Sequence, residues 1–385
     1  MARGTIIKIE TEDGTRWRVR VDMDDPTTGR RLRPQRTYKT RREAEAGLAQ
    51  WRADIERGTA VVPSGKSVRE YLEFWLDTSA RHRVRGTTFA SYQRLVRLYI
   101  IPALSTMALQ KLSAAQIQAL YSSLLTGGGG RSGKGLAPRT VRYIHAILRR
   151  AMREALALGL VARNVTEAVS PPKAPRPPVK SWDAADLRRF MAVAQEDGYS
   201  PLWLLAVHTG MRQGELLGLR WQDVDLDRGV AHVVQALPTV RQGVQFSQPK
   251  TASGRRTIAL DATCIAALRE HKARQNERRL AIGVLWHDYD LVIASAIGTP
   301  LNHTNVYHRF IKLVAIAGVP RIPFHGLRHT HATLLMAAGV HPKVVSERLG
   351  HADISLTLST YSHVLPQMQQ EAAAIFDAAM KEQEG

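Results

Sequence analysis

The chain has 385 residues, enough for two or three domains, and carries 54 Lys and Arg residues against 34 Asp and Glu residues. Its formal net charge of +20 at pH 7 indicates a polyanionic partner, most often nucleic acid. The single cysteine, Cys264, excludes an internal disulfide, and neither a secretory signal nor an apolar run of about 18 residues is evident. We therefore expect a cytoplasmic protein that contacts DNA and no membrane.

Residues 1–63 are predicted to form three short strands and a helix. Residues that favour strands cluster at Thr5–Ile9, Arg16–Val21 and Arg33–Tyr38. Thr40 is a candidate N-cap for a helix that ends near Gly58. The exposed face of this sheet is expected to carry five basic side chains, namely Arg16, Arg18, Arg20, Arg33 and Lys39.

Residues 65–173 are predicted to be helical. Ser, Thr or Pro signals begin four apolar-periodic segments, at Ser67–Ser79, Thr87–Tyr99, Ser113–Thr126 and Pro138–Leu158, and Gly127–Gly135 is a predicted loop. The segment holds 17 basic and 5 acidic residues, so we expect it to be the main DNA-binding unit. Its candidate DNA-binding residues are Arg94, Arg97, Arg139 and Arg142.

The proline-rich stretch Ser170–Lys180 marks a boundary, with the linker placed at 174–180. Residues 181–385 are predicted to be mostly helical, with strands at Val230–Gln235, Val244–Ser247 and Arg256–Leu260. The expected fold class is thus multidomain and mainly α, with a small N-terminal α+β domain, a helical domain and a mixed α/β domain.

Six residues of the last segment have side chains suited to phosphoryl chemistry. Five can bind or protonate a phosphate, and a tyrosine can attack one. They are Arg212 in TGMRQGEL, Lys250 in QPKTASGRR, His325 and Arg328 in HGLRH, His351 in LGHAD and Tyr361 in STYSH. Glu215 lies three residues after Arg212 and is interpreted as the partner that orients it.

The two arginines suit a transition state that gains negative charge. A guanidinium can donate two hydrogen bonds to the non-bridging oxygens of a phosphate. Because a tyrosine phenol has a pKa near ~10, Tyr361 needs a positive field to attack as an anion.

In their order and spacing these motifs resemble those of tyrosine recombinases, specifically the phage and integrative-element integrases similar to lambda integrase. The resemblance implies site-specific recombination of double-stranded DNA through a 3′-phosphotyrosyl intermediate, with no metal or other cofactor. It also implies that Tyr361 is the nucleophile and Lys250 the general acid, while His325 and His351 assist at the phosphate.

The same resemblance assigns a role to each domain. Residues 1–63 resemble an arm-type DNA-binding domain, 65–173 a core-binding domain and 181–385 a catalytic domain. The amphipathic tail Pro366–Gln383 is expected to dock on a neighbouring protomer and to support a homotetramer on DNA. A DNA-bending protein and a directionality factor are further expected partners.

Three other interpretations stay open on the sequence alone. Leu334–His351 has the spacing of a helix-turn-helix with Gly339 at the turn, as in a non-catalytic DNA-binding regulator. A type IB topoisomerase uses similar residues. His325 and His329 lie four residues apart as metal ligands can, but the glutamate of an HExxH motif is missing, so His329 and His331 are interpreted as packing or hydrogen-bonding residues.

Overall fold

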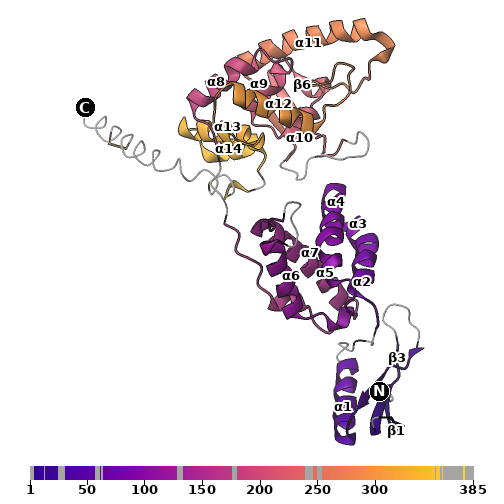
Figure 1. Ribbon diagram of the computed structural model, residues 1–385. Helices are drawn as coiled ribbons and strands as arrows, with labels where there is room; N and C mark the ends of the chain where they lie inside the picture. The colour runs from indigo at the N-terminus through magenta and orange to yellow at the C-terminus, as the bar shows by residue number, and fades with distance from the viewer. Residues whose placement is uncertain are drawn as a thin grey trace. The chain divides into compact units, whose positions relative to one another are not determined.

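The computed structural model divides the chain into two compact units, Met1–Arg176 and Pro177–Gly385 (Figure 1). It describes residues 4–12, 14–24, 31–56, 61, 64–127, 133–175, 180–238, 246–248, 254–351, 353–355, 358 and 376–377. Among these residues, no helix is both long and apolar enough to cross a membrane. The exact limits of the three domains stay a prediction.

The first unit begins with a three-stranded antiparallel sheet in the order β1-β2-β5, which packs against one helix. Val19 and Val21 of the central strand are fully buried beside Ala44, Leu48 and Trp51 of the helix. The predicted sheet with one helix is confirmed. The elements are β1 (Gly4–Thr11), β2 (Gly14–Val21), β3 (Met23–Asp24), β4 (Arg31–Leu32), β5 (Gln35–Tyr38) and α1 (Arg41–Glu56).

Three of the five basic residues expected on this sheet share its open face. Side chains alternate across a strand, so Arg16, Arg18 and Arg20 of β2 lie on the side opposite Val19 and Val21.

The predicted strand Arg33–Tyr38 began two residues too early, so neither Arg33 nor Lys39 lies in a strand, and their placement on that face stays a prediction. Pro34 has no N–H for the ladder, and β5 begins only at Gln35. Arg33 instead pairs with Asp22, with 3.1 Å between its Nε and a carboxylate oxygen. Lys39 lies between β5 and α1.

The rest of the first unit is helical, as predicted. Ser67 and Ser113 each form a capping box with the residue three positions later, and Pro138 occupies the first turn of the longest described helix of this unit. Two helices continue through π-helical turns. The elements are α2 (Val68–Trp75), η1 (Leu76–Ala80), α3 (Arg81–Arg83), α4 (Gly86–Leu95), η2 (Val96–Ile100), α5 (Ile101–Leu104), η3 (Leu109–Lys111), α6 (Ala114–Thr126), α7 (Pro138–Ala157) and η4 (Val165–Ala168).

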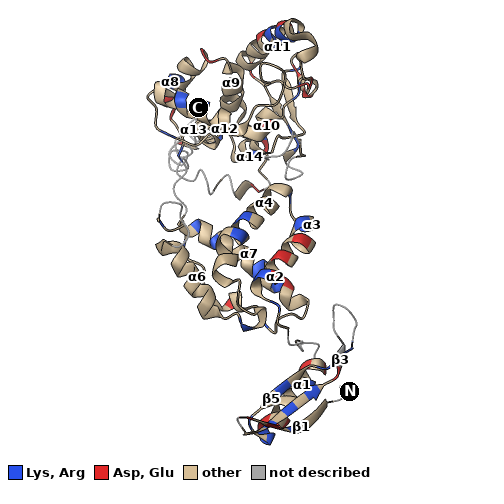
Figure 2. Ribbon diagram, turned by 45° about the vertical axis from the view of Figure 1, so that its right-hand side comes forward, with Lys and Arg blue, Asp and Glu red and all other residues tan. Residues whose placement is uncertain are grey.

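This helical segment has its own apolar core and carries basic residues on α4 and α7 (Figure 2). Arg94, Arg139 and Arg142 are exposed. Arg97 is also exposed, but it forms an ion pair with Glu73 at 2.9 Å. Three of these four candidate DNA-binding arginines are therefore exposed, and within the described residues they form no ion pair that DNA would have to displace.

The second unit is mostly helical around one small sheet in the order β6-β7-β8. Two of its three predicted strands are confirmed as β7 and β8, and half of the third, Val244–Ser247, lies outside the described residues. The elements are α8 (Ala184–Ala194), α9 (Ser200–Thr209), α10 (Gln213–Leu217), η5 (Trp221–Asp223), β6 (Val224–Asp225), β7 (Val230–Val233), β8 (Arg256–Ala259), α11 (Ala262–Ile282), η7 (Gly283–Leu285), α12 (His303–Ile316), α13 (His325–Ala337) and α14 (Pro342–Leu349).

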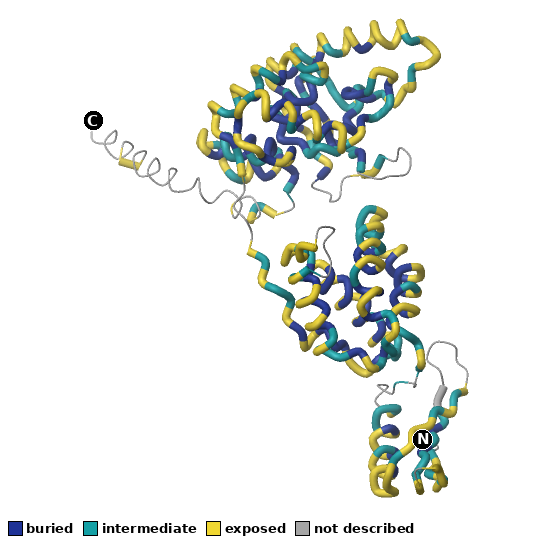
Figure 3. The backbone as a smooth tube through the Cα atoms, viewed as in Figure 1, coloured by how far each residue is buried: buried dark blue, intermediate teal, exposed yellow. Residues whose placement is uncertain are grey.

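An aromatic cluster fixes the helices of this unit against one another. Trp182, Phe190, Trp203, Phe310 and Phe324 lie with their ring centroids 5.0–6.5 Å apart in the contacting pairs. Rings at these distances and tilts gain from burial and from edge-to-face contact. The buried residues of Figure 3 form the interior of the unit, and α9 and α13, which carry or border the candidate site, pack on this interior.

The helices α13 and α14 form a pair joined by a glycine turn. Ala332 and Met336 of α13 pack on Val345 and Leu349 of α14. Gly339 occupies the turn with φ of 77°, a left-handed conformation that favours glycine. The predicted helix-turn-helix spacing therefore corresponds to a real helix pair, and its second helix ends at the candidate site.

Candidate active site

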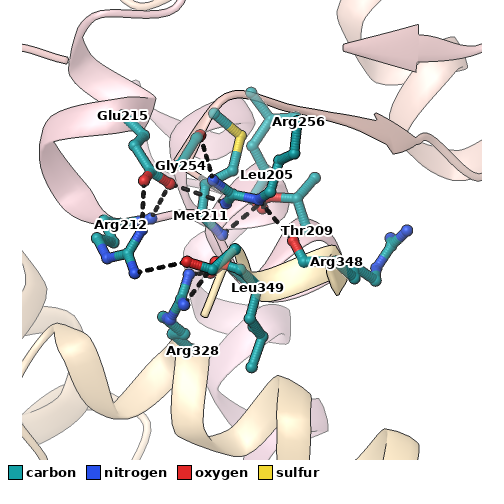
Figure 4. Close-up of polar contacts among 12 residues, drawn as sticks. Leu205, Thr209, Met211, Arg212, Glu215, Gly254, Arg256, Arg328, Arg348 and Leu349 are labelled. Carbon is teal, nitrogen blue, oxygen red and sulfur yellow. Dashed lines mark hydrogen bonds and ion pairs between the residues drawn. The ribbon is translucent and has the colours of Figure 1, made fainter. Parts of the chain in front are cut away.

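Arg212 is held at the start of α10 by the carboxylate of Glu215. Its backbone N–H donates to Glu215 Oε2 at 2.9 Å, and its Nη1 donates to Glu215 Oε1 at 2.7 Å (Figure 4). The Arg212 side chain is still 40% exposed. Its guanidinium is therefore fixed in direction and accessible to a ligand.

Arg328 reaches the same place from α13, but it is only 2% exposed. Its Nη1 donates to the carbonyl of Gly210 at 2.9 Å and its Nη2 to the carbonyl of Leu349 at 2.6 Å. A charged group this deep is tolerated because polar acceptors replace the water it has lost.

Gly210 allows α9, α13 and α14 to meet at this point. It ends α9 with φ of 62°, and a Cβ atom there would come within 2.8 Å of the side chains of both His331 and Leu349. The motif TGMR therefore needs its glycine for backbone conformation and for space.

The C-terminus of α14 is closed by a Schellman motif. Gly350 is left-handed with φ of 67°, its N–H donates to Glu347 O at 2.9 Å, and the N–H of His351 donates to Ser346 O at 3.0 Å. His351 is thereby fixed directly after the helix, where the sequence predicts it.

Three successive carbonyls at this helix end each accept a hydrogen bond from a different arginine. Arg256 Nε donates to Arg348 O at 2.7 Å, Arg328 Nη2 to Leu349 O at 2.6 Å, and Arg212 Nη2 to Gly350 O at 3.3 Å. The last carbonyls of a helix have no partner inside it and carry the negative end of its dipole, so they attract cations. The end of α14 thus brings both predicted catalytic arginines together.

The two predicted catalytic histidines are neutral near this cluster. Loss of hydration, together with nearby His329, Arg328 and Arg212, lowers the pKa of His325 to about 4. Loss of hydration, Arg328 and Arg212 likewise lower the pKa of His351 to about 4. Four of the six predicted residues, Arg212, His325, Arg328 and His351, therefore lie close enough for the two arginines to lower the pKa values of the two histidines.

The remaining two predicted residues, Lys250 and Tyr361, lie outside the described residues. The segment that contains Lys250 is flanked by a bridge between Ala236 and Ser247 and by β8, which begins at Arg256. The predicted tail helix also lies outside the described part, apart from Phe376 and Asp377.

The sequence interpretation missed two arginines that support the site. Arg256 donates from Nη2 to Glu215 Oε2 at 2.9 Å. Arg348 donates to the carbonyls of His208 at 2.9 Å and Ala259 at 3.1 Å. These contacts span 41 to 140 positions of sequence, and no local spacing signals them.

The two other histidines of the HGLRHTH motif have structural contacts. The rings of His325 and His329 meet edge to face with centroids 4.8 Å apart. His331 is buried, donates from Nδ1 to Val207 O at 2.8 Å and accepts at Nε2 from Arg348 Nε at 3.2 Å. Packing and hydrogen bonding were the roles predicted for both.

Within the described residues, one group could offer three metal ligands, namely His208, Asp261 and Cys264. Its atoms are already engaged. Asp261 caps α11 by accepting from the Cys264 N–H at 2.9 Å, and its second oxygen lies 2.6 Å from His208 Nδ1. Burial and Asp261 raise the pKa of the Cys264 thiol to about 12, which disfavours the thiolate. The group is best explained as a helix cap.

The fold and this arginine–histidine cluster define an enzyme of phosphoryl transfer on DNA. The family model described as "Phage integrase family" matches residues 181–368, and that described as "Phage integrase, N-terminal SAM-like domain" matches residues 67–125. The two models together cover more than half of the chain. The chain belongs to the tyrosine recombinases, and its activity is site-specific recombination of DNA.

Relatives match along almost the whole chain. An integrase of Streptomyces ambofaciens is 29% identical over 96% of this chain and 95% of its own length. A protein described as "Tyrosine recombinase XerC-like" from Caldanaerobacter subterraneus is 28% identical over 92% of this chain and 94% of its own. The family assignment favours recombination over the regulator and topoisomerase alternatives.

Solved structures agree in fold. A Tn1549 transposon integrase in complex with transposon right end DNA has a TM-score of 0.65 at 20% identity, and the likeness covers 80% of this chain and 100% of that one. A lambda integrase tetramer bound to a Holliday junction has a TM-score of 0.57 at 19% identity, over 91% and 94% of the two chains. The predicted fold class is confirmed.

Proposed function

We propose that the protein integrates and excises a mobile DNA element, with Tyr361 as the nucleophile at the scissile phosphate. The cluster at the end of α14 carries this proposal, because it presents Arg212 and Arg328 from separate elements toward the same helix end. Two rigid guanidinium groups are what a phosphate needs when its charge grows in the transition state.

In the proposed cleavage step, the Tyr361 phenolate oxygen, which has already lost its proton, forms a bond to phosphorus while the bond from phosphorus to the 5′ oxygen breaks. Arg212 and Arg328 hold the non-bridging oxygens. Lys250 gives a proton to the departing 5′ oxygen, which would otherwise be a poor leaving group. The 3′-phosphotyrosyl link conserves the energy of the phosphodiester, so a 5′-hydroxyl of the partner strand can reverse the step.

His325 and His351 are proposed to contact the same phosphate. Both are neutral at pH 7 in the free protein, because the pKa of each is about 4. A neutral imidazole can donate one hydrogen bond to a phosphoryl oxygen and accept another. The approach of a phosphate would favour the protonated ring and so strengthen this contact.

The DNA is proposed to be gripped by two surfaces of the first unit. Arg94, Arg139 and Arg142 of the helical segment would neutralise phosphates beside the cleavage site, and Arg97 would join them if it exchanged Glu73 for a phosphate. The open sheet face with Arg16, Arg18 and Arg20 would hold a second, arm-type site.

Assembly on the DNA is proposed to follow the pattern of the family. The tail Pro366–Gln383 would dock on a neighbouring protomer within a homotetramer, and a DNA-bending protein and a directionality factor would select between integration and excision. The lambda integrase tetramer bound to a Holliday junction, which this chain resembles in fold, supports the proposed tetramer.

The decisive experiment is the detection of a covalent protein–DNA adduct on a denaturing gel. The DNA is a nicked duplex from the region that flanks the gene, and EDTA is present throughout. We expect the adduct with wild type and with Tyr289→Phe, a control at an exposed tyrosine of the same unit. Tyr361→Phe should give none. An adduct of equal yield with Tyr361→Phe would refute the assignment of the nucleophile.

A further inference from the structure

Arg256 at the start of β8 is a guanidinium for which the cleavage chemistry gives no role. Its side chain is only 6% exposed, whereas that of Arg212 is 40% exposed. It makes three contacts, with Glu215 Oε2 at 2.9 Å, Arg348 O at 2.7 Å and Gly254 O at 3.3 Å. These contacts tie it to Glu215 on one side and to the end of α14 on the other.

We infer that Arg256 is a positioning residue for strand cleavage, which holds Glu215 and the end of α14 so that Arg212 is aimed at the scissile phosphate. The inference rests on the proposed role of Arg212. It goes beyond the pairing of Arg212 with Glu215, since it names the residue on which that pairing depends.

Glu215 is shared between the two arginines. One carboxylate oxygen accepts from the Arg212 guanidinium, and the other accepts from Arg256 and from the Arg212 backbone N–H. The residue is 3% exposed, and a buried carboxylate without a sufficient partner tends to become protonated. Without Arg256, Glu215 would hold Arg212 less firmly.

The ionisation of Glu215 shows the same dependence. Burial by itself raises the pKa of this carboxyl, but the hydrogen bond and the charge of Arg256, followed by the charge of Arg212, outweigh burial and lower the pKa overall. Arg256 is thus the main partner that keeps Glu215 a carboxylate.

Arg256 also braces the helix end that receives both catalytic arginines. Its Nε donates to Arg348 O, next to the carbonyls of Leu349 and Gly350, which accept from Arg328 and Arg212. In the sequence, Arg256 follows Lys250 by six positions. It is the first residue of β8, the strand that follows the proposed general acid in the chain.

The planar shape of the guanidinium explains why this position needs arginine. Its donors point in fixed directions toward a carboxylate on one element and a carbonyl on another, while a lysine ammonium is a single point charge. Arg256→Lys should retain the charge and lose the bridge. This variant separates a geometric role from an electrostatic one.

The test measures single-turnover strand cleavage by full-length protein on a nicked duplex, with DNA affinity measured separately. Two substrates are compared, one with the natural scissile phosphodiester and one with an uncharged methylphosphonate at that position. A neutral phosphorus centre needs less help from guanidinium groups, so a defect that acts through Arg212 should shrink on it. A general loss of structure should slow both substrates equally.

On the phosphodiester, Arg212→Met should slow cleavage on the order of 100- to 1,000-fold, as for a direct donor. Arg256→Met, which acts through another residue, should slow it on the order of 10- to 100-fold with DNA affinity within about twofold. Both defects should shrink on the methylphosphonate. The matched control is Arg220→Met, which removes a partly buried arginine paired with Asp223 in the same unit and should cleave like wild type.

Each contrary result has a distinct meaning. If Arg212→Met cleaves normally, the proposed function itself fails. If Arg212→Met is slow but Arg256→Met is as fast as wild type, or equally slow on both substrates, only the role of Arg256 is overturned. Should Arg256→Met fail to fold, Arg256→Lys decides, and wild-type cleavage by Arg256→Lys would overturn the bridging geometry.

Discussion

The protonation state of each histidine at the site is set by its immediate surroundings. His331 is 8% exposed, and one ring nitrogen accepts from Arg348 while the other faces Val207 O. Burial, followed by the charge of Arg348, lowers its pKa to about 4. A proton added to this ring would face a guanidinium, so the folded protein holds His331 neutral.

This neutral His331 should link the stability of the second unit to pH. Between pH 6.5 and pH 4 the unfolded chain binds a proton that the folded state does not, because the pKa of His331 is about 4 only in the folded protein. The contribution of His331 to the free energy of unfolding is therefore complete above pH 6.5. It falls as the pH drops, by up to about 1.4 kcal/mol per pH unit for one such group.

The check is calorimetry of wild type and His331→Gln across this pH range. Glutamine can form one of the two hydrogen bonds but does not titrate, so its Tm should fall less steeply with decreasing pH. Equal slopes would assign the pH dependence to other groups.

His325 and His351 should instead respond to DNA. Each has a pKa of about 4 in the free protein, and a bound phosphate anion would raise both values. Binding at pH 6 should therefore take up protons, and affinity should increase as the pH is lowered. Titration calorimetry in buffers of different ionisation enthalpy measures the uptake, with Tyr361→Phe as the background that prevents cleavage. Unchanged uptake after replacing both histidines with glutamine would contradict this prediction.

At the level of elements, α14 shows what a sequence can and cannot reveal. The glycine and histidine of LGHAD predict a helix end, and a Schellman motif is present there. The helix starts at Ser67, Ser113 and Pro138 can be predicted equally well, because a cap depends only on residues close in sequence.

Tertiary contacts cannot be predicted from local sequence in this way. Nothing near Arg256 in the sequence indicates that it meets Glu215, because the two are 41 positions apart and belong to different elements. The strand boundary at Gln35 was missed for a smaller reason, since the effect of Pro34 on the ladder was overlooked. The motifs thus indicate which residues react, and the fold adds which residues hold them.

Gly350→Ala tests the importance of the α14 end. Because alanine is disfavoured in the left-handed conformation of Gly350, the variant should be less stable by about 1–2 kcal/mol. A shift of the carbonyl at position 350 should also weaken its hydrogen bond from Arg212 and slow cleavage. The control is Gly339→Ala, because Gly339 is also left-handed, a Cβ there has open space, and its N–H donates to Met336 O rather than lying among the arginine-bonded carbonyls. Both variants should lose similar Tm, while cleavage should fall beyond that only in Gly350→Ala. Equal cleavage by the two variants would make the helix end a matter of stability alone.

At the scale of the whole molecule, the net charge of +20 belongs to a protein with more than one basic surface. The open sheet face and the α4–α7 region lie around separate apolar cores. Binding through several phosphate contacts depends steeply on salt, by a slope of roughly 0.9 per contact for duplex DNA. Total charge alone cannot distinguish a dedicated second DNA site from general attraction.

A charge-matched comparison makes that distinction. Arg16→Gln with Arg20→Gln removes two charges from the open sheet face, and Arg41→Gln with Arg42→Gln removes two from exposed positions of α1 in the same domain. Affinity is measured at several salt concentrations on a short duplex around the cleavage site and on a longer one that includes its flanks. Wild type should bind the longer duplex more tightly through the arm-type site.

The sheet-face variant should lose that gain, and its salt slope on the longer duplex should fall by roughly 2. It should bind the short duplex nearly as wild type does, because the helical segment is untouched. The α1 variant should keep the gain, since its charges lie on the other side of the domain. If both variants lose affinity equally on both duplexes, the first domain contributes only diffuse charge and the second DNA site does not exist.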